Sequence, residues 1–337
     1  MTASASRDRI VVLDGATLNP GDNPWDEVAR LGDLEVHPRT ASPDVVARAI
    51  GARVVLTNKT VLDREAFAAL EGLELVCVLA TGVNVVDLEA ATAHGVTVCN
   101  VPEYSSDSVA QHVFALLLEL VAGVGELDAA VRDGEWARRP DFSFWKRPLR
   151  ELAGSTMGIV GHGRIGSRVG EIAQAFGMDV MAFSPSRSRA GRAPGFKWAS
   201  IEDIFASADV VSLHCPLTAD NARFVDAGLL ASMKPGALLL NTSRGGLVDE
   251  QALASALGRG CPSAAALDVL SVEPPPVDHP LVGLPNCLVT PHVAWSTLAA
   301  RRRLMAVTAA NVSSFFQGRH QNVVVAPRTG VTTWRTP

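Results

Sequence analysis

The sequence predicts an α/β protein with two doubly wound parallel sheets. Short runs of β-branched and apolar residues alternate with helical stretches along the whole 337-residue chain. One such run leads into glycines with GxGxxG spacing at 161–166, and these glycines open an amphipathic stretch. The length is sufficient for about two domains. These three observations together indicate the fold class.

The composition is that of a globular protein. Hydrophobic residues make up 47% of the chain and charged residues 19%, and the net charge of -5 gives no general reason to bind nucleic acid or an anionic membrane. The five cysteines are scattered without a CxxC pair, which favours reduced thiols over disulfides or a metal site. The longest apolar run, 113–125, contains Glu119 and is too short to span a bilayer. With no apolar leader at the N-terminus, we expect a cytoplasmic protein without nucleic-acid or membrane partners.

Two series of strands are expected along the chain. The first lies at 10–15, 34–39, 53–58, 73–82 and 96–100, with helices at 43–51 and 63–70 between its strands. A long helix over 106–123 follows, with Ser106 or Asp107 as its N-cap. The second series lies at 156–161, 179–184, 209–215, 237–243, 264–269 and 287–291.

These elements suggest a division into a discontinuous first domain and a second domain inserted in it. A last long helix, at about 296–317, returns the chain to the first domain. We therefore expect a substrate domain at 1–107 plus 298–337 and a cofactor domain at 108–297.

The glycine turn predicts a dinucleotide site. Gly161 permits the tight turn, Gly163 lets the backbone approach a diphosphate, and Gly166 lets the helix pack on the strand. The diphosphate would lie at the positive end of the following helix. Methyltransferases have a related loop, so the glycines alone leave that alternative open.

Polar residues follow three strands of the second series. Arg244 follows the strand at 237–243, Asp268 and Glu273 follow the next, and His292 follows the last. Because ligands of open α/β sheets bind at the carboxyl ends of the strands, these side chains are expected to converge. Histidine beside a carboxylate suits proton donation to a nascent alkoxide, and arginine suits a substrate carboxylate. The alternatives are a surface arginine, a solvated glutamate and a core histidine.

The chain resembles the D-isomer-specific 2-hydroxyacid dehydrogenase family from about residue 40 to 325. The resemblance rests on "GIVGHGRIG", "HCPLT", "LLLNTSRGGLVDE", "ALDVLSVEP" and "TPHVAW". It implies a flavodoxin-like substrate domain and a Rossmann cofactor domain. It also implies that Arg244, Glu273 and His292 are catalytic and that Asp268 binds the nicotinamide carboxamide. Within the family, the stretch 78–120 and "PDFSFW" are most similar to glycerate dehydrogenases, also called hydroxypyruvate reductases.

The same resemblance implies further contacts and a partner. Backbone amides of the loop at Ala80, Thr81, Gly82 and Val83 would hold the substrate carboxylate, and family members are usually dimers paired through the cofactor domain. We therefore expect a homodimer. Further cofactor contacts are expected from Arg164, Ile165, Cys215, Pro216, Thr242, Ser243 and Ala294.

The residue at 184 bears on the choice of cofactor. Dinucleotide folds specific for NAD have an acidic residue there, which accepts hydrogen bonds from the adenine ribose. This chain has Ser184, followed by Ser186, Arg187, Ser188 and Arg189. Serine lacks the charge that repels a 2′-phosphate, and Arg187 is the best single candidate to bind one. The prediction is NADP(H) in preference to NAD(H), the alternative being solvent-exposed arginines and modest selectivity.

Two cations allow more than one interpretation of the substrate. Lys146 and Arg147 follow "FSFW", where glycerate dehydrogenases typically have acidic and apolar residues. They are either an ordinary solvated surface or a site for a second substrate anion, as in 3-phosphonopyruvate. The leading prediction is reduction of a small 2-keto acid of the hydroxypyruvate or glyoxylate type to its D-2-hydroxy acid. The alternative from another class is a nucleotide-sensing, corepressor-like binding protein.

Overall fold

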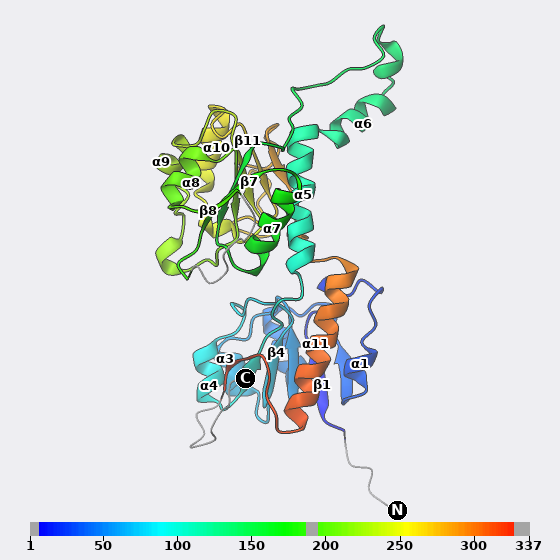
Figure 1. Ribbon diagram of the computed structural model, residues 1–337. Coiled ribbons are helices and arrows are strands. Elements are labelled where there is room, and N and C mark those ends of the chain that lie inside the picture. The colour runs from blue at the N-terminus through cyan, green and yellow to red at the C-terminus, as the bar shows by residue number, and fades with distance from the viewer. Residues whose placement is uncertain (1–6, 187–194, 327–337) are drawn as a thin grey trace, which may run out of the picture. The chain divides into compact units, whose positions relative to one another are not determined.

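A computed structural model describes residues 7–186 and 195–326 of the protein. The chain forms two compact units, residues 1–105 with 296–337 and residues 106–295. Each unit has a sheet of mostly parallel strands flanked by helices (Figure 1). The predicted class of two doubly wound α/β domains is therefore confirmed.

The first unit is flavodoxin-like. Its sheet has the strand order β13-β5-β4-β3-β1-β2, so the five parallel strands follow the flavodoxin order. The sixth strand, β13, runs antiparallel to β5 and was not expected from the sequence, because its three valines lie on an edge and show no alternation. The strands are β1 (Arg9–Val12), β2 (Asp33–Val36), β3 (Val54–Thr57), β4 (Leu75–Val78), β5 (Thr97–Cys99) and β13 (Val323–Val325).

Helices cover the first sheet and begin where the sequence provides caps. Asp63 and Asp87 each accept a backbone amide at the start of α3 and α4, which satisfies an N–H that the helix itself leaves unpaired. Thr297 does the same for the long helix α11, whose expected range of 296–317 is close to the observed one. The helices are α1 (Asp26–Ala29), α2 (Val45–Ala49), α3 (Arg64–Ala69), α4 (Leu88–Ala93) and α11 (Leu298–Phe316).

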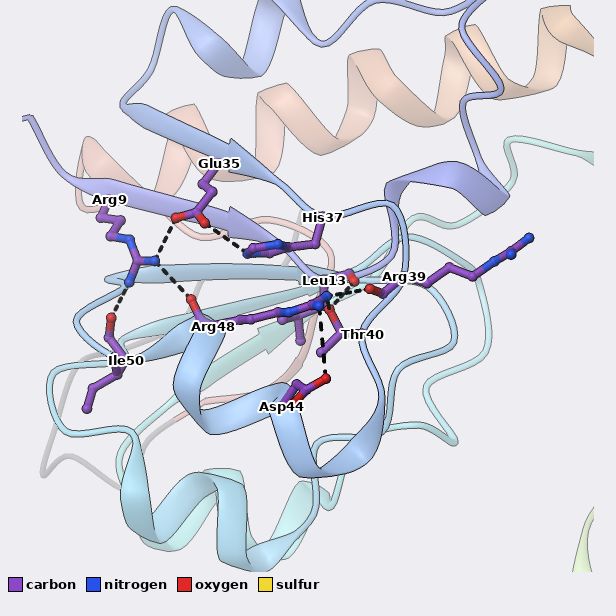
Figure 2. Close-up of polar contacts among 9 residues, drawn as sticks. All are labelled: Arg9, Leu13, Glu35, His37, Arg39, Thr40, Asp44, Arg48 and Ile50. Atoms are coloured by element: carbon purple, nitrogen blue, oxygen red, sulfur yellow. Dashed lines mark hydrogen bonds and ion pairs between the residues drawn. The ribbon is translucent and has the colours of Figure 1, made fainter.

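Most side chains of edge strand β2 are exposed, and polar contacts hold the strand in place. Figure 2 shows Glu35 between Arg9 of β1 and His37, at 2.7 Å and 3.0 Å from the two partners. The bond from Arg9 lowers the pKa of the Glu35 carboxyl below its ordinary value. Arg48 of α2 reaches the Arg39 carbonyl and the Thr40 hydroxyl, so the segment after β2 is tied to the helix.

The second unit has the Rossmann strand order with one additional strand. Its sheet reads β12-β11-β10-β9-β6-β7-β8, and all pairs are parallel. The short outer strand β8 was not predicted. The strands are β6 (Thr156–Val160), β7 (Asp179–Phe183), β8 (Phe196–Trp198), β9 (Val210–Leu213), β10 (Leu238–Asn241), β11 (Ala264–Leu267) and β12 (Cys287–Val289).

Helix α5 is the principal cover of one face of this sheet. Its apolar residues, with those of α7, form a buried core cluster against β6, β7 and β10. The helix begins at Ser106, so Asp107 lies inside the first turn and pairs with Arg168 at 3.0 Å. The predicted N-cap at Ser106 or Asp107 is therefore wrong by at least one residue. The helices are α5 (Ser106–Ala122), α6 (Val124–Arg132), α7 (Arg164–Ala175), α8 (Ile201–Ser207), α9 (Ala227–Ala231) and α10 (Glu250–Gly258).

The described residues show no sign of a membrane span, a metal site or a disulfide. Within 7–186 and 195–326 there is no helix long and apolar enough to cross a membrane. The same ranges contain no group of three or more His, Cys, Asp or Glu side chains arranged to hold a metal ion. The five cysteines, all of them in the described part of the chain, are free thiols.

Candidate active site

Most of the predicted site residues lie at the carboxyl edge of the second sheet. Six neighbouring strands end in them, and the strand order reverses between β6 and β9, where such folds bind nucleotides. In spatial order they are Ser184 after β7, Gly161 and Gly163 after β6, Cys215 and Pro216 after β9, Thr242, Ser243 and Arg244 after β10, Asp268 and Glu273 after β11, and His292 and Ala294 after β12. Arg164, Ile165 and Gly166 form the first turn of α7.

The glycine turn is built for close approach. Gly161 has a φ of +100°, and a Cβ there would lie 2.4 Å from the Cys215 amide nitrogen. A Cβ on Gly166 would lie 2.2 Å from the carbonyl oxygen of Gly161. Within the described ranges, in contrast, no atom lies within 4 Å of a Cβ built on Gly163, and no side chain there caps the N-terminus of α7. The residues present therefore fit a dinucleotide diphosphate.

Two serines lie where the adenine ribose is expected. The hydroxyl oxygens of Ser184 and Ser186 are 3.5 Å apart, and Ser184 is half-buried at the end of β7. Arg187, Ser188 and Arg189 fall outside the described residues.

A histidine at the end of β9 is held neutral. Burial and the proximity of His162 lower the pKa of His214 to about 3, so that His214 is neutral at physiological pH.

His292 and Glu273 form a direct pair. Nδ1 of His292 lies 2.7 Å from Oε2 of Glu273, and the side chains are 26% and 34% exposed. The other carboxylate oxygen of Glu273 accepts the Leu270 amide at 3.0 Å, which fixes the carboxylate. No described group forms a hydrogen bond or ion pair with Nε2 of His292. This nitrogen is therefore available to exchange a proton with a substrate.

The backbone of His292 is strained and firmly held. Its φ of +53° lies in the left-handed region, which is uncommon for a residue other than glycine. The His292 amide donates to the Asp268 carbonyl at 2.8 Å, and the Trp295 indole donates to the His292 carbonyl at 2.9 Å. Such strain persists only where the surroundings over-determine the conformation.

Asp268 anchors the loop that carries His292. Its carboxylate, which is wholly buried, accepts the Thr290 hydroxyl at 2.6 Å and the amides of Val293 and Ala294 at 2.9 and 2.8 Å. Burial by itself would raise the pKa of this carboxyl group, but the surrounding donors outweigh it and hold the pKa below its ordinary value. All these contacts bind Asp268 to the loop, and its bond to a nicotinamide carboxamide stays a prediction.

Two residues of this network were missed in the sequence. Ser108 and His112, both on α5, contact the same loop: Ser108 donates to the Ala294 carbonyl at 2.7 Å, and Nε2 of His112 lies 3.0 Å from the Thr290 hydroxyl. The available signal was a pair of polar residues one turn apart on a helix whose buried face is otherwise apolar.

Arg244 is on a loop that packs against the loop of Glu273. A Cβ on Gly245 would lie 1.9 Å from the carbonyl carbon of Leu270, so the two loops touch backbone to backbone. The Asn241 side chain bridges the turn by donating to the Arg244 carbonyl at 2.8 Å and accepting the Ser243 amide at 3.0 Å. The Arg244 side chain is exposed and donates to the Ser243 carbonyl at 2.7 Å.

The predicted carboxylate loop belongs to the first unit. Thr81, Gly82 and Val83 follow β4, and the loop is fixed by the Thr81 hydroxyl on the Val101 carbonyl at 3.1 Å and by Asn100 on the Thr81 carbonyl at 2.7 Å. Among the described residues nothing accepts from the amides of Gly82 and Val83. These two donors are thus free for an anion.

Lys146 and Arg147 are internally paired. Lys146 forms an ion pair and hydrogen bond with Glu135. Arg147 donates to the Glu119 carbonyl at 2.8 Å and lies 3.5 Å from Glu126. Both cations have partners in their own unit, which favours a structural role over recognition of a second substrate anion.

A glycine turn that fits a diphosphate, a histidine paired with a carboxylate and an arginine lie on one sheet edge, which is the arrangement expected of a nucleotide-dependent dehydrogenase. Residues 114–294 match the family model described as D-isomer specific 2-hydroxyacid dehydrogenase, NAD binding domain. The chain belongs to this family. It is therefore an oxidoreductase acting on 2-hydroxy and 2-keto acids, which confirms the predicted class and removes the methyltransferase alternative.

Similar proteins agree with this assignment. The chain is 43% identical over 319 residues to the hydroxypyruvate reductase of Blautia hydrogenotrophica, covering 94% of this chain and 99% of that protein. It is 39% identical to the glycerate dehydrogenase of Methylorubrum extorquens, covering 84% and 88%. Among solved structures, the NADPH-dependent glyoxylate/hydroxypyruvate reductase of Sinorhizobium meliloti, in complex with NADP and malonate, has a TM-score of 0.82 at 27% identity, covering 97% and 100%.

Proposed function

We propose that this enzyme reduces hydroxypyruvate or glyoxylate to the corresponding 2-hydroxy acid, the D-isomer where C2 is chiral, with NADP(H) as the preferred cofactor. The observation that carries the proposal is the 2.7 Å pair between His292 and Glu273 at the carboxyl edge of a dinucleotide fold. The hydroxypyruvate, glycerate and glyoxylate activities named for its relatives support the substrate class.

His292 is the proton donor in this proposal. A bound reduced nicotinamide supplies the hydride that the carbonyl carbon receives. Nε2 of His292 gives its proton to the carbonyl oxygen, while the Glu273 carboxylate at Nδ1 stabilises the imidazolium form before transfer. The product is the neutral 2-hydroxyl group, and His292 is left as the neutral imidazole.

Arg244 and the loop of Thr81 orient the substrate. The Arg244 guanidinium binds the substrate carboxylate through two N–H groups and polarises the adjacent carbonyl. The amides of Gly82 and Val83, in the first unit, stay the predicted donors to a substrate carboxylate. Because these groups bind the carboxylate and carbonyl that all 2-keto acids share, the substituent on the carbonyl carbon distinguishes one substrate from another.

A substrate panel tests the proposal. We expect kcat/KM to be highest for hydroxypyruvate or glyoxylate and higher with NADPH than with NADH, with pyruvate and 3-phosphonopyruvate as comparison substrates. A strong preference for 3-phosphonopyruvate would contradict this choice and restore a second-anion site. Tight nucleotide binding without turnover on any acid would instead support the corepressor-like alternative.

Ser184 is proposed to permit NADP(H). We expect Ser184→Asp to lower the NADPH/NADH ratio of kcat/KM by about tenfold or more, because the new carboxylate repels a 2′-phosphate and accepts from ribose hydroxyls. Ser184→Ala is the matched control, since it removes the hydroxyl without adding charge and should change the ratio far less. A wild-type preference for NADH, or a ratio unaffected by Ser184→Asp, would contradict the assignment.

The enzyme is proposed to be a homodimer joined through the segment 124–145. This segment projects from the end of α5 in Figure 1 and exposes Trp145 to 63% and Phe142 to 90%. Apolar side chains of this size, exposed together, are typical of an interface. We expect sedimentation at about twice the 35.5 kDa chain mass, and a shift toward the monomer in Phe142→Asp with Trp145→Asp. Val277→Asp, at a fully exposed valine elsewhere, is the control and should leave the mass unchanged.

A further inference from the structure

Helix α5 contacts both ends of the His292 loop. Ser108 and His112 are four residues apart and so lie on the same face of the helix. Ser108 reaches the Ala294 carbonyl at 2.7 Å, and His112 reaches the Thr290 hydroxyl at 3.0 Å. His292 lies between these two points of attachment. The helix therefore supports the segment that carries the proton donor.

The hydrogen-bond directions fix the state of His112. The Thr290 hydroxyl donates its single hydrogen to Oδ1 of Asp268 at 2.6 Å, so it can only accept from a second partner. Nε2 of His112 must then carry a hydrogen and donate to Thr290. The same nitrogen lies 3.4 Å from Oδ1 of Asp268, which also attracts a donor. Donation thus runs from α5 through Thr290 to the buried carboxylate.

We infer that Ser108 and His112 are positioning residues for the reaction: Ser108 acts through the Ala294 carbonyl and His112 acts through Thr290 and Asp268, and together they hold His292 in register with Glu273. The inference rests on the proposed role of His292 as proton donor. Without the two bonds from α5, the loop keeps its hydrogen bonds to Asp268 and to Leu267 of β11, but it loses its attachment to the helix. A left-handed histidine then has more freedom to relax away from Glu273.

Nδ1 of His292 and Oε2 of Glu273 are 2.7 Å apart, so a small displacement of the His292 loop would disrupt their hydrogen bond and lower the rate. A displacement of about 1 Å remote from the reacting atoms can cost about 10²-fold in rate. We therefore expect His112→Leu, which has no donor, to lower kcat for reduction by about 10- to 100-fold. KM for the nucleotide should change less than kcat, because the glycine turn expected to bind the diphosphate is on another loop, although Asp268 and Ala294 are themselves predicted cofactor contacts.

Variants that keep the hydrogen bond are compared with variants that lose it, which distinguishes a positioning role from a role in stability alone. His112→Gln places an amide N–H near the position of Nε2 and should retain most of the activity, whereas His112→Leu should not. Thr290→Ser keeps the hydroxyl and should likewise be active, whereas Thr290→Val should be impaired like His112→Leu. Gln111→Leu, at an exposed neighbour on α5, is the control for disturbance of the helix.

The pH profile gives a readout that loss of stability would not move. Reduction requires the imidazolium of His292, and a looser pairing with Glu273 makes that form less stable. The basic limb of kcat/KM should therefore move to lower pH in His112→Leu and Thr290→Val, and stay in place in His112→Gln and Thr290→Ser. Circular dichroism and NADPH binding verify that each variant is folded.

Several outcomes would overturn the inference. It is wrong if His112→Leu and Thr290→Val keep the wild-type kcat and pH profile, or if His112→Gln is as impaired as His112→Leu. If His112→Leu does not fold, the comparison of Thr290→Ser with Thr290→Val decides. An active His292→Ala enzyme would refute the proposed function itself, whereas an inactive one beside a normal His112→Leu would refute only the role of α5.

Discussion

Replacing His292 with alanine is expected to lower kcat for reduction by about two to four orders of magnitude, the usual scale for a positioned general acid. The reason is that Nε2 is the proposed donor to the nascent alkoxide and Nδ1 is already engaged by Glu273 at 2.7 Å. Steady-state kinetics with hydroxypyruvate measures the loss, and fluorescence titration with NADPH should show that nucleotide binding survives.

Two comparisons make the His292 result specific. His94→Ala, at an exposed histidine of the first unit, should behave as wild type. Glu273→Gln removes the carboxylate charge but keeps the shape, so the basic limb of the reduction profile should move to lower pH. Activity of His292→Ala within a few-fold of wild type would show that another group delivers the proton.

The second large effect is expected at Arg244. Arg244→Lys keeps the positive charge but loses the planar pair of N–H donors, so it should raise KM and lower kcat together. A lost hydrogen bond to a charged group is worth about 1.5–3 kcal/mol, which corresponds to a loss of about 10- to 100-fold in kcat/KM. Kinetics on hydroxypyruvate and glyoxylate would measure both constants.

A matched lysine substitution controls for charge and length. Arg259→Lys, at an exposed position after α10, has no predicted part in the reaction and should be neutral. If Arg244→Lys were equally neutral, bidentate binding of the carboxylate would be excluded. An increase in KM at unchanged kcat would mean that Arg244 binds the substrate without polarising its carbonyl.

The sequence predicts the structure best where a prediction depends on residues that are close together in the chain. The strands of both sheets, except β8 and β13, were located because apolar runs of four to eight residues bounded by turn residues are a property of adjacent positions. The glycine turn was equally visible, since only glycine tolerates the backbone at 161 and the contact at 166. The expected convergence of Arg244, Glu273 and His292 at one sheet edge follows once parallel strands are assumed.

The sequence does not show which partners the charged side chains have. Lys146 and Arg147 were open to two interpretations in the sequence, because it does not show which acidic residues lie beside a given cation. Their partners Glu135, Glu119 and Glu126 belong to the same segment, but only the fold of that segment brings them together. The partner of Asp107 was equally invisible, because its carboxylate pairs with Arg168, 61 residues away in sequence.

The sequence by itself determined the family and the class of two α/β domains, and it predicted the catalytic set Arg244, Glu273 and His292, because each depends on a short motif or on where a strand ends. Only the tertiary structure decided how His292 is held. Its supports, Ser108 and His112, are 186 and 178 residues away from their partners Ala294 and Thr290. Hydrogen bonds across such separations depend on the packing of α5 against the sheet, and no local pattern of residues specifies that packing.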